Sequence, residues 1–390
     1  MNEIVVRELA DSSIRDWLDV PHFVYRDDRH FVPRLDLLER ARVSKRKNHF
    51  FGHGEAAFFV AYKDGRPVGR ISAQADQNYL ARYQDATGHF GFYDVPDDAE
   101  VSRRLLAAAA GWLSSRGLRR VTGPFSLTIN EESGLLVSGY DMPASVAMPH
   151  AAPWQPALLE RAGFRGIRDL LGFRFKPGSL SDTAFWQLMK IARKTSFNAR
   201  ITIRDMNKRN FDEEIRTIVD IFNEGSRNSW GAVPLTAEEL SGAIGDYRLF
   251  FRKNYAKFIC IDGKPEGFIF WPPNLVEITA KFGGKLFPLN WARLLYAFAF
   301  EKFRSGRMPL LGIRTAAHSR WRSFVLFALL FEHWLKDLAR YDLDWMELAW
   351  IVESNRILVD MLRESLGPPV RVYRVYEASV EHLLAPGGSA

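Results

Sequence analysis

Hydrophobic and polar positions follow one recurring order along the chain. Short apolar or alternating runs, typical of strands, bracket longer stretches whose apolar residues recur at helical spacing. The helical spacing is clearest near residue 215, where one face carries Phe211, Ile215, Ile218, Val219 and Phe222. Strands mixed with helices in this way predict an α/β fold of the α+β kind, with a mixed sheet.

One hairpin pattern occurs twice. Residues 57–72 (AFFVAYKDGRPVGRIS) and 257–271 (KFICIDGKPEGFIFW) each read as a strand, an Asp-Gly turn and a second strand. Asp-Gly supplies the positive φ angles that a tight turn between strands needs. Gly263 follows Gly65 by 198 residues, and Gly267 follows Gly69 by the same 198. The equal offsets predict two copies of one domain.

Both copies continue through the same series of elements. The series, given for the first and second copy in turn, is a strand (89–95; 309–316), a helix (99–116; 323–340), a strand (119–125; 345–352), a short helix (153–164; 354–367) and a closing strand (166–175; 370–377). Pro, Gly and Ser break the pattern within 176–182. We therefore predict an N-terminal domain over 1–178 and a C-terminal domain over 179–390.

Composition narrows the chemistry. The single cysteine, Cys260, excludes an internal disulfide and a multi-cysteine zinc site, and its apolar neighbours predict a buried strand thiol. The nine histidines show no metal-binding spacing, so we expect no metal. The first residues lack the basic and then apolar order of a signal peptide, which predicts a cytoplasmic protein. The longest nearly apolar runs, 324–331 and 294–300, are shorter than the ~20 residues that a membrane span needs.

The net charge of +7 predicts an attraction to polyanions. Two groups of basic residues contribute to it: Arg40, Arg42, Lys45, Arg46 and Lys47, and then Lys190, Arg193, Lys194, Arg200, Arg204, Lys208 and Arg209. These groups are either ordinary solvated faces or, beside 29 Phe, 12 Tyr and 11 Trp, a surface for peripheral contact with an anionic membrane. We do not expect nucleic acid to be a partner.

The order of elements resembles the GNAT superfamily of N-acyltransferases, here as a tandem pair covering nearly the whole chain. The run from Thr128 to Phe164 (TINEESGLLVSGYDMPASVAMPHAAPWQPALLERAGF) resembles a bacterial group of tandem GNAT-like proteins that includes the bacterial ceramide synthases. The resemblance implies transfer of a long-chain fatty acyl group from acyl-CoA, a co-substrate rather than a bound cofactor, to the amine of a sphingoid base. Another acyl or aminoacyl transferase, or a non-catalytic CoA- or lipid-binding module, stays open.

The resemblance also places the cofactor residues in the second copy. Backbone N–H groups and a helix N-terminus bind the CoA pyrophosphate in this superfamily. The residues that fall in that register are Ile313, Arg314, Thr315, Arg320, Arg322, Ser323 and Asn355. Ser323 replaces the usual glycine, and Asn355 is either a cofactor contact or a helix cap. The tyrosine that often protonates the leaving thiolate is absent, so water, a cation, Tyr373 or Tyr376 would serve.

The first copy has acidic residues where the phosphate loop would be. Asp94, Asp97, Asp98 and Glu100 would repel a pyrophosphate there. We therefore expect the second copy to hold acyl-CoA and the first copy to build the acceptor pocket.

Three residues of the first copy are candidates for the general base that deprotonates the amine. Glu132 directly precedes an apolar strand, where partial burial would suit a carboxylate base; Glu131 would face the opposite side. His150, at the end of a predicted strand over 145–150, has a pKa suited to the task. The alternatives are that both carboxylates are solvated, that Asn130 and Glu131 cap a turn, and that His150 is structural.

Overall fold

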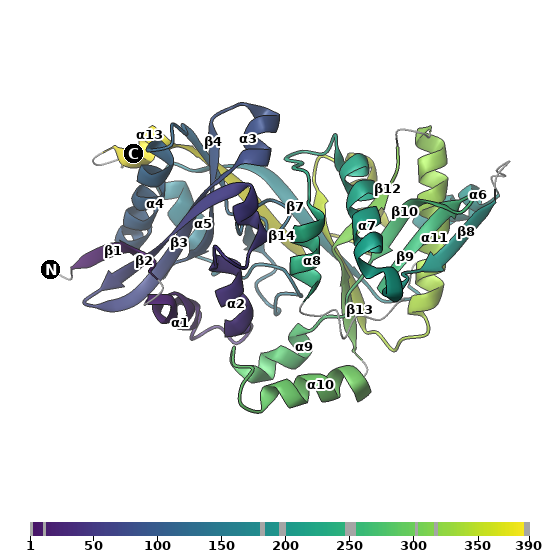
Figure 1. Ribbon diagram of the computed structural model, residues 1–390, viewed down its shortest axis with the longest axis horizontal. Coiled ribbons are helices and arrows are strands. Elements are labelled where there is room, and N and C mark those ends of the chain that lie inside the picture. Colours follow the sequence, from purple (N-terminus) through teal and green to yellow (C-terminus); the bar gives the residue numbers. More distant parts are fainter. Residues whose placement is uncertain are drawn as a thin grey trace. The chain divides into compact units, whose positions relative to one another are not determined.

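The computed structural model describes residues 3–10, 13–179, 184–194, 200–245, 255–300, 303–315 and 319–385. The chain divides into two compact units, each made of separate segments (Figure 1). Unit 1 comprises residues 1–170, 276–294 and 371–390, and unit 2 comprises residues 171–275 and 295–370. The boundary between residues 178 and 179 therefore stays a prediction about the sequence repeat, because the packing units follow a different division.

Unit 1 is built on a mixed sheet in the order β1-β2-β3-β4-β5-β14, with β6 paired to β14. The strands are β1 (Ile4–Glu8), β2 (Gly54–Lys63), β3 (Arg66–Asp76), β4 (Thr87–Asp94), β5 (Arg120–Gly123), β6 (Leu135–Ser138) and β14 (Arg371–Ser379). The helices are α1 (Ile14–Val24), α2 (Asp36–Val43), η2 (His49–Gly52), α3 (Gln77–Tyr83), α4 (Ala99–Ser114), α5 (Gln155–Arg161), α9 (Val276–Thr279), η5 (Ala280–Phe282) and α13 (Val380–Leu384).

Helices cover both faces of this sheet. Gly69 on β3 faces Val101 and Leu105 of α4, whereas the next residue, Arg70, donates a hydrogen bond to the carbonyl of Trp17 in α1. Neighbouring residues of a strand point to opposite faces, so α4 and α1 lie on opposite sides. The side under α1 holds a core of buried aromatic rings in which Trp17 packs edge-on against Phe58.

Unit 2 contains a four-stranded sheet in the order β12-β10-β9-β8 and a parallel pair, β11 and β13. The strands are β8 (Ile201–Asp205), β9 (Ala256–Ile261), β10 (Lys264–Phe270), β11 (Ser305–Met308), β12 (Leu310–Ile313) and β13 (Trp345–Val352). The helices are α6 (Ala184–Arg193), η3 (Lys208–Asn210), α7 (Phe211–Ser226), α8 (Ala237–Gly245), α11 (Arg320–Leu338) and α12 (Arg356–Leu366). Strand β7 (Arg165–Phe175) and helix α10 (Asn290–Phe300) each have residues in both units.

The two predicted hairpins are confirmed, and they match in detail. Asp64 and Gly65 join β2 to β3 with φ angles of 52° and 76°, and Asp262 and Gly263 join β9 to β10 with 48° and 83°. Each hairpin also has one register shift. It falls at the residue directly before the second glycine of the repeat, which is Gly69 in the first copy and Gly267 in the second. A repeated irregularity at the same offset supports two copies of one fold. The predicted helices over 99–116 and 323–340 are α4 and α11.

In both copies one strand separates from its parallel neighbour. Strand β4 pairs with β5 only from Thr87 to His89, although its pairing with β3 continues to Asp94. In the second copy the strand predicted over 309–316 corresponds to β12, which pairs with β10, whereas the segment just before it, β11, pairs with β13. In the first copy the chain after β5 enters the opening, where the Phe125 N–H donates to the Phe90 carbonyl at 2.7 Å.

The closing strands are exchanged between the packing units. Strand β14 closes the second copy in sequence, yet it pairs with β5 and β6 in unit 1. The last residues of β7, which closes the first copy, belong to unit 2, where β7 neighbours β13. Arg174 of β7 binds Glu347 of β13 there, at 2.9 Å. In the part of the chain that the structure describes, no helix is both long and apolar enough to span a bilayer.

Gly91 on β4 offers a test of the opening in the first copy. A Cβ at this position would overlap the carbonyl oxygen of Phe125, a backbone atom that cannot move aside cheaply. We expect Gly91→Ala to lower the free energy of unfolding by about 1–3 kcal/mol or more, measured by urea denaturation. Gly111→Ala is the control: its Cβ meets nothing within 4 Å, and alanine should stabilise α4 by ~0.5–1 kcal/mol. Equal midpoints for the two variants would contradict this account of the opening.

Candidate active site

The acidic loop between β5 and β6 is closed on itself. The Ser126 N–H donates to the carbonyl of Glu132 at 2.9 Å, and the Gly134 N–H donates to that of Pro124 at 2.8 Å. The turn at its tip is organised by Thr128, whose hydroxyl accepts from the Asn130 N–H at 3.0 Å. This loop therefore holds its two carboxylates in a fixed place, rather than leaving them in an extended segment.

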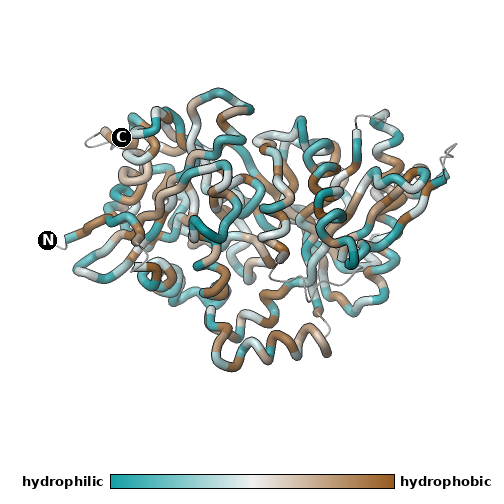
Figure 2. The backbone as a smooth tube through the Cα atoms, in the orientation of Figure 1, coloured by the Kyte–Doolittle hydropathy of each residue, from teal (hydrophilic) through white to brown (hydrophobic). Residues whose placement is uncertain are grey.

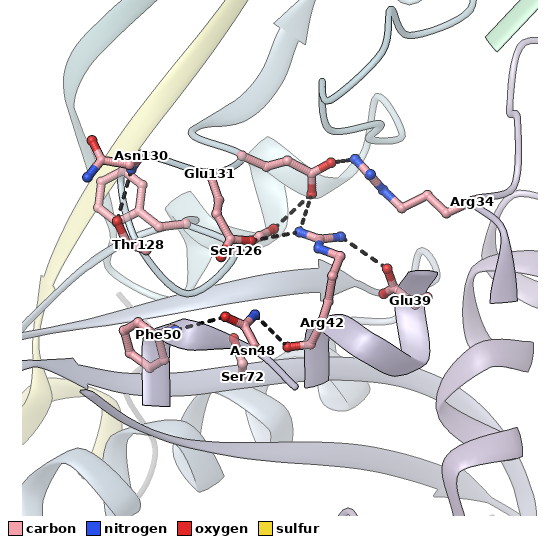
Figure 3. Close-up of polar contacts among 12 residues, drawn as sticks. Arg34, Glu39, Arg42, Asn48, Phe50, Ser72, Ser126, Thr128, Asn130 and Glu131 are labelled. Carbon is pink, nitrogen blue, oxygen red and sulfur yellow. Dashed lines mark hydrogen bonds and ion pairs between the residues drawn. The ribbon is translucent and has the colours of Figure 1, made fainter. Parts of the chain in front are cut away.

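Glu132 is buried and doubly paired. Its side chain forms ion pairs with Arg34 and with Arg42, the latter at 3.0 Å, and it accepts a hydrogen bond from the Ser126 hydroxyl at 2.9 Å. Figure 3 labels these three partners of Glu132. The residue is only 8% exposed. Charge-assisted hydrogen bonds from two guanidinium groups stabilise the carboxylate form. Glu132 is thus an anchor for two arginines.

Glu131 does not face the opposite side, as alternation along an extended chain predicted. Its carboxylate lies 3.6 Å from the same Arg42 guanidinium, because the turn at Thr128 brings both acidic side chains toward α2. Glu131 is the more open of the two, with 28% of its side chain exposed. The alternative that Asn130 and Glu131 cap a turn stays a prediction; at this turn the Thr128 hydroxyl accepts from the Asn130 N–H.

The pairing continues inward from Arg42 through a buried chain of charges. Arg42 also binds Glu39 at 3.0 Å, Glu39 binds Arg70 at 3.0 Å, and Arg70 binds Asp94 at 2.6 Å. The Tyr25 hydroxyl then donates to Asp94 at 2.6 Å. We call this set the polar network: Tyr25, Arg34, Glu39, Arg42, Arg70, Asp94 and Glu132. It contains three guanidinium groups and three carboxylates, and Glu131 adds a further carboxylate at 3.6 Å from Arg42.

The ionisation of the polar network follows from its geometry. Burial alone raises the pKa of Glu39, but the guanidinium groups of Arg42, Arg70 and Arg34 lower it from 4.5 to about 2. Burial, with the nearby charge of Asp94, raises the pKa of Tyr25 well above its usual value. Glu39 is therefore a charged structural partner at neutral pH, and Tyr25 keeps its proton.

His150 lies beside this network. The segment 145–150 is irregular rather than the predicted strand, because the chain turns at Ala147 with a φ of 55°. The His150 Nε2 lies 2.8 Å from Asp28 Oδ2, and its ring packs edge-on against Tyr25 at 4.9 Å between centroids. Arg34 donates a 3.5 Å hydrogen bond to the carbonyl of Met148, which links this segment to Glu132. His150 and Glu132 thus belong to one polar region of unit 1.

Sequence reasoning missed most of this region. Arg42 counted as part of a basic surface cluster, and Asp94 as a group that repels phosphate, yet both are interior ion-pair partners. The sequence analysis assigned no role to Arg34, Glu39 or Arg70. The available signal was an arginine, Arg70, inside an otherwise apolar strand, which required a buried acidic partner.

The predicted cofactor residues of unit 2 lie around the end of β12. The Arg314 Nη1 lies 2.7 Å from Glu224 Oε2, and the Thr315 N–H donates to Glu224 Oε1 at 3.0 Å. Ile313 is buried, and the Ser323 hydroxyl donates to the Arg314 carbonyl at 3.3 Å. The carboxylate of Glu224 therefore occupies the charged and backbone donors that the resemblance assigns to CoA.

The helix that follows begins with a neutral cap. The Ser319 hydroxyl accepts from the Arg322 N–H at 3.3 Å, and Arg320 and Arg322 are exposed in the first turn of α11. His318, which the sequence places in the predicted phosphate loop, lies outside the described residues. Asn355 occupies the N-cap position of α12, but its exposed side chain makes no capping hydrogen bond. The role of Asn355 in binding the cofactor stays a prediction.

The corresponding helix in the first copy has an acidic cap. Asp98 accepts from the N–H groups of Glu100 and Val101, each at 3.1 Å, and pairs with Lys63 at 2.7 Å. A protein carboxylate thus takes the place that a phosphate would need at this helix N-terminus. Asp97 has no part in these contacts.

The two tyrosines proposed as thiolate acids lie on β14, in unit 1. Tyr373 is fully buried and accepts a hydrogen bond from Arg371 at 3.2 Å. The Tyr376 hydroxyl contacts Glu160 at 3.3 Å, and burial together with that carboxylate raises its pKa well above 10. Cys260 is buried, as predicted, and burial raises the pKa of its thiol. Among the described residues no cluster of three or more His, Cys, Asp or Glu side chains fits a metal ion.

The chain is similar in sequence to two known bacterial proteins over nearly its whole length. No family model matches the chain. The chain is 36% identical over 374 residues to protein YghO of Escherichia coli (strain K12), covering 95% of this chain and 94% of the relative. It is 29% identical over 382 residues to bacterial ceramide synthase of Caulobacter vibrioides (strain NA1000 / CB15N), covering 96% of this chain and 97% of the relative.

Solved structures confirm the tandem GNAT fold. A tandem GNAT protein from the clavulanic acid biosynthesis pathway aligns with a TM-score of 0.54 at 13% identity, over 99% of this chain and 100% of the other. A GCN5-related N-acetyltransferase from Sphaerobacter thermophilus aligns with a TM-score of 0.50 at 12% identity, over 99% and 98%. At these identities the likeness establishes the fold alone.

The burial of His150 predicts a dependence of stability on pH. Burial lowers the pKa of His150 below 6.5, and the carboxylate of Asp28 partly offsets that shift. The unfolded chain therefore binds a proton more readily, so the free energy of unfolding should fall as the pH drops below about 6.5. His150→Gln should flatten this fall in urea denaturation between pH 7 and 5. Asp28→Asn should steepen it, because the group that favours the charged ring is removed; an unchanged profile in both variants would refute the assignment.

Proposed function

The chain belongs to the family of tandem GNAT-like N-acyltransferases represented by its full-length relatives, and from that premise we propose that it makes ceramides. It would transfer a long-chain fatty acyl group from acyl-CoA to the amine of a sphingoid base. The observation that carries this choice of substrate is the similarity to bacterial ceramide synthase along 96% of the chain. The polar region of unit 1 supplies the acid–base groups that such a transfer requires.

We assign the role of general base to His150. Acyl transfer needs a neutral amine, and a free amine near its reference pKa of ~10 is mostly charged at pH 7. Because burial lowers the pKa of His150, its ring is neutral at that pH and can accept the proton. When Nε2–H donates to Asp28, Nδ1 is the basic nitrogen. Asp28 then has an orienting role.

The reaction balances with these groups. The amine nitrogen attacks the thioester carbonyl, the new C–N bond forms and the C–S bond breaks, and the amine proton passes to His150. The thiolate takes a proton from water and leaves as free CoA, and His150 then releases the amine proton to water. Once acyl-CoA displaces Glu224 from Arg314 and the Thr315 N–H, backbone N–H groups near Ile313 to Thr315 would hold the carbonyl oxygen. The side chains of Arg314, Arg320 and Arg322 would bind phosphate.

We propose that Glu132 contributes through position rather than proton transfer. It holds Arg34 and Arg42 at the edge of the polar network, and 37% of the Arg34 side chain is exposed. Arg34 in turn contacts the main chain two residues before His150. Glu131, nearby and more open, is suited to attract a cationic amine.

Purified protein with long-chain acyl-CoA and a sphingoid base should release free CoA and form an amide, detected by thiol titration and mass spectrometry. The lone buried cysteine keeps the thiol background low. His150→Gln should lower kcat by about 10²–10⁴-fold. Absence of turnover across several acyl chain lengths would overturn the proposed substrate pair. Turnover that requires an aminoacyl-tRNA would favour the alternative donor.

The two adjacent carboxylates provide a matched pair of variants within the same assay. Glu132→Gln should reduce activity and also destabilise the fold by about 3–5 kcal/mol, because Arg34 and Arg42 lose the buried carboxylate that they share. Glu131→Gln, at the more exposed position, should change stability by less than about 1 kcal/mol. Loss of kcat in Glu132→Gln without loss of stability would return the role of base to Glu132.

Glu224 allows a separate test of the cofactor site. Because its carboxylate occupies Arg314 and the Thr315 N–H, it competes with any phosphate that binds there. Glu224→Gln should tighten CoA binding by roughly tenfold in titration calorimetry, since the competing charge is removed. Glu213→Gln, at an exposed position on the same helix, should leave the affinity unchanged. Weaker binding by Glu224→Gln would mean that Glu224 braces the site instead of competing for it.

A further inference from the structure

Helix α10 and the turn before it carry an unusual concentration of exposed apolar side chains. Among the described residues, twelve large apolar side chains are exposed, and six of them fall between 287 and 300. They are Phe287 (65% exposed), Leu289 (72%), Trp291 (45%), Leu295 (43%), Tyr296 (58%) and Phe300 (75%). Figure 2 shows α10 as a helix coloured as hydrophobic over most of its length.

The exposed apolar residues that belong to α10 itself form one face of the helix. The buried residues are Leu294, Ala297 and Phe298, which recur at helical spacing on one side. Trp291 and Leu295 lie one turn apart on the outward part of the helix, as do Tyr296 and Phe300, whose rings are 5.0 Å apart. An ordinary surface helix places polar residues outward, so this helix is apolar on both sides. Such an outer face is stable only when something covers it.

The segment is held firmly at its start. The Gly284 carbonyl accepts a hydrogen bond from the Asp36 N–H at 2.8 Å, which ties the turn to α2. Gly284 has a φ of +80°, and a Cβ there would lie 3.0 Å from the Arg34 carbonyl oxygen. The Asn290 side chain then donates to the Lys285 carbonyl at 2.6 Å at the start of the helix. The apolar face is therefore presented by a built structure, with a fixed attachment to unit 1.

The charged residues of the segment are all basic, and this indicates the kind of partner that it binds. Residues 281–300 contain Lys281, Lys285 and Arg293, all exposed, and no aspartate or glutamate. Exposed aromatic rings combined with only basic charge are typical of elements that lie in the interface of an anionic bilayer. A protein partner or a second copy would not require this uniform sign of charge.

We propose that residues 281–300 dock the protein on anionic membranes. The outer face of α10 would enter the headgroup and upper acyl region, and the three basic residues would contact lipid phosphates. This inference deepens the proposed function, on which its biological purpose rests, because long-chain amines and their amides partition into bilayers. The docking surface itself stands on its own geometry.

The test is co-sedimentation of the full chain with phosphatidylglycerol vesicles and with phosphatidylcholine vesicles. Wild-type protein should bind the anionic vesicles, and the double variant Tyr296→Ser, Phe300→Ser should bind roughly tenfold or more weakly. Ile357→Ser is the matched control: Ile357 is 85% exposed on α12, outside the segment, and its replacement should not change binding. Lys281→Gln, Lys285→Gln and Arg293→Gln together should remove most of the preference for anionic lipid.

Two further readouts keep the inference distinct from the proposed reaction. The Tyr296, Phe300 double variant should retain wild-type turnover of short-chain, water-soluble substrates while losing turnover of substrates held in vesicles. Equal sedimentation of wild type and double variant would overturn the docking surface, whatever the enzymatic result. Concentration-dependent dimerisation of wild type alone, without vesicle binding, would also overturn it and assign the face to a second copy of the chain.

Discussion

The ion pair between Arg42 and Glu132 is the contact on which the rest of the candidate site depends. It joins α2 to the loop after β5, and through Glu39 and Arg70 it reaches Asp94 at the end of β4. Each of these side chains is largely buried, so each charge needs its partner. The pairing of each guanidinium group with carboxylates allows a charged interior to exist beside an aromatic core. It also fixes the acidic loop relative to the strands that open beneath it.

The opening of β4 from β5 and this charge network explain each other. Where β4 leaves its parallel neighbour, the chain after β5 crosses Gly91, and the Phe125 N–H donates to the Phe90 carbonyl at 2.7 Å. That crossing directs the loop toward α2, which carries Arg42. Without the opening, the loop would continue beside the sheet, and Glu132 could not reach Arg42. Local backbone geometry thus decides which side chains become neighbours.

The elements that could be predicted from the sequence are those whose cause is local. Asp-Gly fixes each hairpin, and apolar spacing fixes α4, α7 and α11, because these signals act over a few residues. The candidate site could not be predicted in the same way. Arg42 and Glu132 are 90 residues apart, and neither reveals its partner. For the same reason, no local signal showed that β14 would pair with β5 rather than stay with its own copy.

The corresponding helix N-termini of the two copies are capped in opposite ways, and we base the proposed division of roles on this difference. In α4 the carboxylate of Asp98 accepts the free N–H groups and pairs with Lys63, which satisfies both the backbone donors and the positive end of the helix. In α11 the cap is the neutral hydroxyl of Ser319, and Arg320 and Arg322 add positive charge. We propose that an anion gains little at the first helix N-terminus and more at the second, so that the second copy holds acyl-CoA and the first copy supplies acid–base groups. Such a division needs no change in the backbone plan.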